Sequence, residues 1–291
     1  MLHAIRAFFH GRGYIEINTP ILTRAPAPEP HIDCFEVGED YYLIPSPELN
    51  MKRLMSETGF ERCYQLGPVF RNGERGRFHN PEFVLLEWYG MGCTYVDLME
   101  QVESLISFVL DALSLPGSCC YQGRSLNLTP PYVRMTVREA FLKFAGTLPP
   151  SPFDEQSFDQ AMLELVQPGL ATIGKPVFLL DWPGERASLA RLKPEDPGVA
   201  DRVELYAGGV ELANGFSELT DPEEQATRFV RANEMRIKTG RPVYPWPEDF
   251  LLSLGHLGEC AGMAFGIERF LMLLLDKDSI DDVMAFTIEK A

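Results

Sequence analysis

The stretch FRNGERGRFHNPEFVLLEWY, residues 70–89, decides the fold because it joins an arginine-rich loop to a strand with two distinct faces. Successive side chains of a β-strand point to opposite sides of the sheet. One side of the expected strand is wholly apolar and predicts a contact with the core; it carries Val84, Leu86 and Trp88. The other side mixes an acid and a phenol with apolar groups, which suits a cavity wall or a solvent-facing surface; it carries Phe83, Leu85, Glu87 and Tyr89.

The loop before this strand concentrates positive charge in an otherwise acidic chain. It carries Arg71, Arg75, Arg77 and His79. Arginine offers planar donors that bind phosphate oxygens in pairs, so the loop predicts a polyphosphate site. A solvated charged loop is the alternative. The chain has neither a GxxxxGK[ST] motif nor a GxGxxG after a strand, so bound ATP would not sit on a P-loop or Rossmann scaffold.

The stretch VELYAGGVELANG, residues 203–215, is typical of a β-hairpin that turns at two consecutive glycines. With Gly208 and Gly209 in the turn, the expected cross-strand pairs are Tyr206 with Glu211 and Glu204 with Ala213. Glu204 and Glu211 then lie diagonally on one face, within reach of a shared cation. Carboxylates without Cys or His ligands favour Mg²⁺, bound together with phosphate oxygens. Two solvated glutamates are the alternative.

A third region, AGMAFGIERF at residues 261–270, combines small residues with one arginine. Small residues let the backbone approach a ligand closely. Arg269 stands at the start of an apolar helix, where a guanidinium must pair, reach solvent or bind an anion. Glu218 adds an acid in the otherwise apolar, turn-like stretch NGFSEL.

The composition is that of a soluble globular protein. The chain has 291 residues and a net charge of -16, which argues against broad non-specific binding to a phosphate backbone. Its six cysteines form neither a CxxC pair nor a metal-binding spacing, which is typical of thiols in a reducing compartment. The N-terminus is amphipathic rather than a secretory signal, and no apolar stretch is long enough for a membrane span. We therefore expect a cytoplasmic protein without a membrane partner.

Local patterns predict an α+β fold with strands dominating the centre. The expected strands are 14–18, 41–44, 63–70, 82–89, 178–182 and the hairpin 203–215. The expected helices are 2–11, a helix starting at Ser46-Pro47-Glu48 with Ser46 as its N-cap, 97–113, 221–240 and 266–275. Residues 115–175 are less informative, with two short helices near 136–145 and 155–166, and we expect one domain, 1–291, with an insertion there.

Taken together, these segments resemble the three motifs of the class II aminoacyl-tRNA synthetases, in their lysine branch. The N-terminal helix and the strand ending near Pro20 resemble motif 1, residues 70–89 resemble motif 2, and AFGIERFLML resembles motif 3. SPELNMKRL and ELANGFSEL resemble the pocket segments of the lysine subclass. The resemblance implies an antiparallel β-sheet flanked by helices and a homodimer built on motif 1.

The chain begins directly at motif 1, without the anticodon-binding domain of lysyl-tRNA synthetases. It is therefore most similar to a stand-alone paralogous family, the elongation factor P-lysine ligases, and no anticodon recognition is expected. The resemblance implies that ATP and Mg²⁺ are the cofactors. It implies that (R)-β-lysine or lysine is activated as an adenylate and transferred to a lysine side chain of elongation factor P. A truncated lysine-tRNA ligase and a catalytically silent regulator are the alternatives.

The resemblance also implies roles for individual residues. Arg71 and Arg269 would be catalytic through the phosphates, and Glu204 and Glu211 would hold Mg²⁺. ATP would be bound by Arg71, Asn72, Gly73, His79, Asn80, Phe83, Glu211, Leu212, Gly266 and Arg269. The amino acid would be bound by Ser46, Pro47, Glu48, Glu87, Tyr89, Asn214, Glu218 and Ala264, with Glu218 pairing with its distal ammonium.

Two positions depart from the family patterns. Gly73 stands where motif 2 has a glutamate, and Glu74 follows, so the adenine contact is lost or shifts by one residue. Ala264 stands where lysyl-tRNA synthetases have glycine. Its methyl group would reshape the pocket beside the substrate backbone and favour a β-amino acid over α-lysine.

Overall fold

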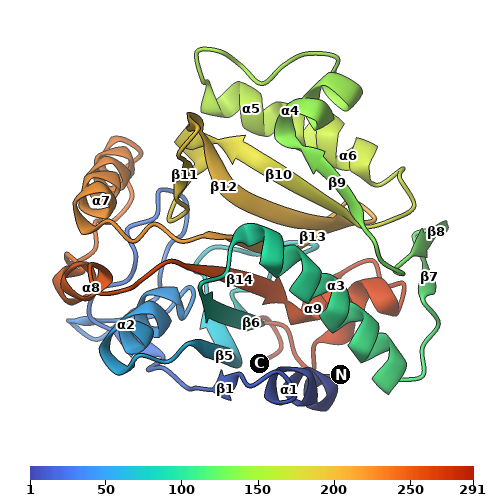
Figure 1. The fold of residues 1–291 in the computed structure, drawn as a ribbon, viewed down its shortest axis with the longest axis horizontal. Helices are drawn as coiled ribbons and strands as arrows, with labels where there is room; N and C mark the ends of the chain where they lie inside the picture. Colours follow the sequence, from blue (N-terminus) through green and yellow to red (C-terminus); the bar gives the residue numbers. More distant parts are fainter.

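The computed structural model describes residues 1–291 and is built on a central sheet of nine strands (Figure 1). All neighbours from β5 to β10 are antiparallel, whereas β1 and β9 join the two ends in parallel. The spatial order is β1 (Ile15–Glu16), β5 (Arg62–Phe70), β6 (Glu82–Met91), β14 (Cys260–Gly266), β13 (Val210–Ser217), β12 (Asp196–Ala207), β10 (Val177–Pro183) and β9 (Val133–Thr136), with β11 (Leu192–Lys193) paired to β12. The predicted fold class, an antiparallel-dominated α+β sheet with flanking helices, is confirmed.

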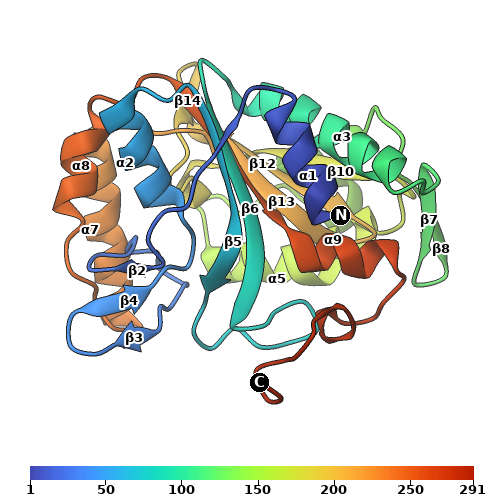
Figure 2. The ribbon, with the colours of Figure 1, turned by 90° about the horizontal axis from the view of Figure 1, so that it is seen from below.

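Helices cover both faces of this sheet (Figure 2). One face is covered by α1 (Leu2–His10), α3 (Tyr95–Ala112) and α9 (Ile267–Leu274). On the other side of β5 and β6 lie α2 (Glu48–Thr58), α7 (Pro222–Lys238) and α8 (Glu248–Leu254). Smaller elements are the sheet of β2 (Leu22–Thr23), β4 (Tyr41–Leu43) and β3 (Glu36–Val37), the hairpin of β7 (Ser118–Tyr121) and β8 (Arg124–Asn127), and the short helices η3 (Gly184–Arg186) and η4 (Ile280–Val283). None of the helices combines the length and hydrophobicity needed to cross a bilayer.

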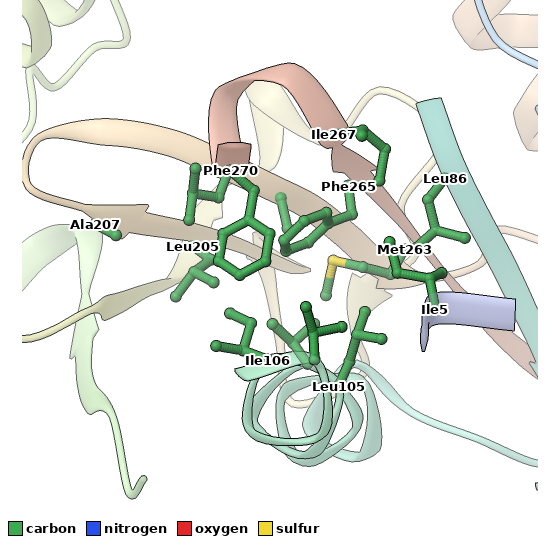
Figure 3. Close-up of a cluster of buried hydrophobic side chains, with 14 of the residues drawn as sticks. Ile5, Leu86, Leu105, Ile106, Leu205, Ala207, Met263, Phe265, Ile267 and Phe270 are labelled. Carbon is green, nitrogen blue, oxygen red and sulfur yellow. The ribbon is translucent and has the colours of Figure 1, made fainter. Parts of the chain in front are cut away.

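The largest core lies between the sheet and the α1, α3 and α9 layer (Figure 3). Leu86 and Trp88 of β6 are fully buried in it, as the alternation along the strand predicts. The Trp88 Nε1–H donates to Gln101 Oε1 of α3 at 2.7 Å, so the one polar atom of the ring is satisfied. This apolar face fixes the orientation of β6 and turns Phe83, Leu85, Glu87 and Tyr89 to the opposite side of the sheet.

The hairpin of β12 and β13 turns at Gly208 and Gly209, as predicted. Both glycines have positive φ, 58° and 84°, which a two-residue turn of this kind requires. Tyr206 pairs with Glu211 as predicted, but Glu204 pairs with Asn214 and not with Ala213. The predicted pairing is wrong because β13 carries one extra residue, which shifts the register between Leu205 and Tyr206.

The region 115–175 contains the two predicted helical segments and additional elements. They are α4 (Val137–Ala140) continuing into η1 (Phe141–Ala145), and α5 (Glu155–Ala161) continuing into η2 (Met162–Val166). A further short helix, α6 (Gln167–Leu170), strand β9 and the β7–β8 hairpin were not predicted. Phe141, Phe158 and Met162 pack with Leu179 of β10 in a separate small core, which places this region against one end of the central sheet.

Candidate active site

A cavity of about 710 Å³ lies on the face of the sheet opposite the main core. Its walls come from β6, the β12–β13 hairpin, β14 and the start of α9, together with the 71–80 loop, the start of α2 and helix α5. Most residues predicted to bind ATP, metal or amino acid line it: Ser46, Glu48, Arg71, His79, Asn80, Phe83, Glu87, Tyr89, Glu204, Glu211, Leu212, Asn214, Ala264, Gly266 and Arg269.

One end of the cavity is cationic. Arg269 donates through Nη1 to the Glu211 carbonyl oxygen at 3.0 Å and through Nε to the Phe78 carbonyl oxygen at 3.2 Å. Its Nη2 lies 2.8 Å from His79 Nε2. Burial and the adjacent Arg269 charge lower the pKa of His79, so the neutral imidazole accepts this hydrogen bond. These contacts fix the guanidinium in the cavity wall.

Arg71 and Phe83 form the neighbouring part of the wall. The Arg71 guanidinium carbon lies 5.1 Å from the centre of the Phe83 ring, and Nε donates to the Pro45 carbonyl oxygen at 3.3 Å. The side chain of Arg71 is partly exposed, at 24%. A planar cation beside an aromatic ring in a cavity can receive a phosphate and a flat base.

The other two arginines of the loop, Arg75 and Arg77, do not line the cavity, so the prediction that the whole arginine cluster forms the polyphosphate site is wrong for them. Arg75 pairs with Asp281 at 2.7 Å and with Glu289 at 2.6 Å. Arg77 pairs with Asp278. The reason is that acidic residues near the C-terminus neutralise these two arginines, and neither lines the cavity.

Glu204 and Glu211 line the cavity beside the cationic end. Arg202 Nη2 donates to Glu204 Oε1 at 2.7 Å, and the Tyr206 hydroxyl donates to Oε2 at 2.6 Å. Burial and the nearby charge of Glu211 raise the pKa of Glu204 to about 7. No group of three metal-ligating side chains occurs. Two carboxylates nevertheless fit Mg²⁺, which commonly takes one or two from the protein and its other ligands from phosphate and water.

The other end of the cavity is acidic and is lined by Glu48 and Glu87. The Tyr89 hydroxyl donates to Glu87 Oε2 at 3.1 Å, and Glu87 is buried. Burial and the nearby charge of Glu48 raise the pKa of Glu87 to about 8. Ala264 of β14 lies between Glu87 of β6 and Asn214 of β13 in the sheet register. Carboxyl groups around a small side chain suit a compact ligand that carries ammonium groups.

The raised pKa of Glu87 predicts a pH-dependent stability. The side chain of an unfolded chain ionises near 4.5, whereas the folded protein holds the proton up to about 8. The folded state therefore binds more protons between these values, and the free energy of unfolding falls as the pH rises through them. Glu87→Gln should make this fall smaller. Urea unfolding at about pH 5 and about pH 8 measures the effect; an equal fall in the variant and the wild type would contradict it.

Four predicted site residues do not line the cavity. Pro47 is the buried cap residue of α2, which begins one residue later than predicted, although Ser46 Oγ accepts from the Glu48 N–H at 3.0 Å. Asn72 and Gly73 are exposed in a turn, because the Asn72 N–H donates to the Asp33 carbonyl oxygen and Gly73 has a φ of 79°. Glu74 lines the cavity in their place, which fits a shift by one residue.

The fourth is Glu218, whose buried side chain pairs with Lys52 and does not line the cavity. Sequence reasoning also missed several lining residues: Glu29, Phe158, Asp159, Arg186 and Arg202. Arg202 stands two residues before Glu204 on the same strand face, and this spacing could have identified it. The others come from segments without a local signal and reach the cavity only through the tertiary fold.

The sequence is similar to that of known proteins along its whole length. The family model of the class II tRNA synthetases for Asp, Lys and Asn matches residues 1–290. Similar curated proteins are named elongation factor P–(R)-β-lysine ligase. That of Vibrio cholerae is 38% identical, and the alignment covers 100% of this chain and 94% of the relative. Those of Proteus mirabilis and Photorhabdus laumondii are each 39% identical, covering 99% and 100% of this chain and 92% and 94% of the relatives.

Proposed function

Because the chain belongs to the class II tRNA synthetase family, we propose that it is an ATP-dependent ligase that activates (R)-β-lysine and transfers it to elongation factor P. The family inferred from the motifs is thus confirmed. The curated relatives share the whole length of the chain, which supports the same activity for this protein. The acceptor is a lysine side chain of elongation factor P.

One observation carries the proposal: a single cavity joins a cationic end to an acidic end. Arg71 and Arg269 line the first, beside Glu204 and Glu211. Glu48 and Glu87 line the second. A nucleotide triphosphate and a diamino acid could therefore meet in one space, with the carboxylate of the amino acid directed at the phosphates.

The proposed chemistry is acyl transfer in two steps. The substrate carboxylate, already ionised at neutral pH, attacks the α-phosphorus of ATP, and pyrophosphate leaves. Arg71 and Arg269 stabilise the negative charge that shifts onto the phosphates. The amine of the acceptor lysine then attacks the carbonyl carbon of the adenylate, and AMP leaves. Positioning of the reactants supplies much of the rate, since no side chain of the enzyme itself has to act as a nucleophile.

We propose Mg²⁺ as the second cofactor. Glu204 and Glu211 would hold it, and the ion would supply charge neutralisation at the phosphates. The proposal also includes a homodimer formed through the N-terminal helix and strand, a cytoplasmic location and no anticodon recognition. Analytical ultracentrifugation tests the dimer.

The test of the activation step is ATP–pyrophosphate exchange with (R)-β-lysine and α-lysine in parallel. We expect exchange with both isomers and a higher kcat/KM for the β-isomer. Transfer is then followed to elongation factor P and to lysine tRNA. Absence of exchange with either isomer would overturn the proposed function, and transfer to tRNA alone would favour a lysine-tRNA ligase.

Ala264 is the residue that we expect to set the preference between the isomers. Its methyl group projects into the cavity between Asn214 and Glu87. Ala264→Gly should raise the kcat/KM ratio of α-lysine to β-lysine by about tenfold, because one methyl group in a pocket changes discrimination by roughly 1–3 kcal/mol. Ala213→Gly, a change at another alanine of the cavity wall, serves as the control. An unchanged ratio in Ala264→Gly would contradict this role.

A further inference from the structure

Lys52 is a lysine with almost no contact with solvent. It lies on α2, and its side chain is 1% exposed. Its Nζ donates to Glu48 Oε1 at 2.6 Å and forms an ion pair with Glu218. The ammonium also lies 5.5 Å from the centre of the Phe216 ring. Lys52 thus bridges a carboxylate that lines the cavity, Glu48, to a buried one that does not, Glu218.

This arrangement requires a charged lysine. A buried ammonium is costly unless it is paired, and here two carboxylates share it. Burial alone would lower the pKa of Lys52, but the charges of Glu218 and Glu48 raise it above its usual value. Other titratable groups face this cluster: Cys260 at the start of β14, and Glu87 and Tyr89 of β6.

The Tyr89 ring and the Glu218 carboxylate both lie against Gly262 of β14. A Cβ placed on Gly262 would meet Tyr89 Cε1 at 2.1 Å and Glu218 Oε1 at 2.7 Å. Only glycine therefore fits at this position of β14, where the Tyr89 ring and the Glu218 carboxylate both come against the strand. A ligand at this end of the cavity lies next to Tyr89 and within the electrostatic reach of Glu218.

Two carboxylates share the Lys52 ammonium: Glu48 lines the cavity, and Glu218 is buried and does not line it. Burial raises the pKa of Glu218 well above its usual value, and the charge of Lys52 opposes this shift. Lys52 therefore holds both carboxylates in a fixed orientation, and an ammonium group entering this end of the cavity would meet the carboxylate of Glu48 already oriented.

We propose that Lys52 is a positioning residue for the amino-acid substrate, which holds the carboxylates of Glu48 and Glu218 in the orientation that receives a substrate ammonium group. The inference rests on the proposed function, since it assumes a diamino acid in this cavity. Lys52 acts through Glu48 and Glu218 and does not touch the substrate. Without it, the two carboxylates would share a proton and lose their fixed orientation.

The test measures pyrophosphate exchange by Lys52→Met and by Lys52→Gln, which keeps a hydrogen-bond donor without the charge. We expect the KM for the diamino acid to rise by about tenfold or more, with the KM for ATP unchanged within about twofold. The defect should shrink as the pH rises, because loss of the Lys52 charge raises the pKa of Glu218 further and this carboxyl group ionises again only at higher pH. A merely structural role would not produce this pH dependence.

The control is Arg53→Met, a change at the next residue of α2, which pairs with Glu57 and Asp249.

The outcomes are distinct. An unchanged KM for the diamino acid in the folded variants would overturn the role of Lys52. The same holds if both KM values rise together, or if neither variant folds, since Lys52 would then be a structural residue. Absence of exchange in the wild-type protein would instead overturn the proposed function itself.

Discussion

Replacing Arg269 by alanine is expected to abolish ATP–pyrophosphate exchange. The guanidinium is held in the cavity wall by two backbone carbonyl oxygens, so it is oriented before a nucleotide arrives. A preorganised cation is worth most where charge develops, here on the departing pyrophosphate. Loss of one such donor typically costs about 10²- to 10³-fold in rate, and we expect at least this loss in kcat/KM.

The matched control is Arg77→Ala. Arg77 is an arginine of the arginine-rich loop. It pairs with Asp278 and does not line the cavity. We expect near wild-type exchange in this variant. Full exchange activity in Arg269→Ala would contradict the phosphate role of Arg269.

The second large effect is expected for Glu204→Gln. The amide has the size of the carboxylate, and its oxygen can still accept from Arg202 or Tyr206, so the fold should persist. The negative charge available to Mg²⁺ is halved, because Glu211 alone remains. We expect a loss of about 100-fold in exchange and a higher Mg²⁺ requirement, in line with the several kcal/mol that a metal contributes to charge stabilisation.

Titration of exchange activity with Mg²⁺ measures this effect. Glu195→Gln, a change of the same kind at an exposed turn, should leave the titration unchanged. A Mg²⁺ dependence of Glu204→Gln identical to that of the wild type would contradict the metal role. The site would then bind the phosphates through its arginines alone.

The features that sequence reasoning predicted are those set by local chemistry. The alternation along β6 separates Trp88 in the core from Glu87 in the cavity, because side chains of a strand must alternate. The turn at Gly208 and Gly209 follows from the positive φ that only glycine adopts without strain. Such rules depend on neighbours in the chain, so one sequence suffices to apply them.

The features that it missed depend on the tertiary fold. Arg75 and Arg77 carry the same charge as Arg71, and only the position of the C-terminal acids separates their roles. The extra residue in β13 leaves no signal in the residue pattern, so the partner of Glu204 was predicted wrongly. Lys52 resembles any helical lysine until Glu218, far along the chain, is placed beside it.

The most direct test of the central claim is mass spectrometry of elongation factor P after incubation with this protein, ATP, Mg²⁺ and (R)-β-lysine. We predict the addition of one β-lysyl group to a lysine side chain, dependent on ATP and lost with Arg269→Ala. An unmodified elongation factor P, under conditions where the protein is folded and its nucleotide is consumed, would contradict the account.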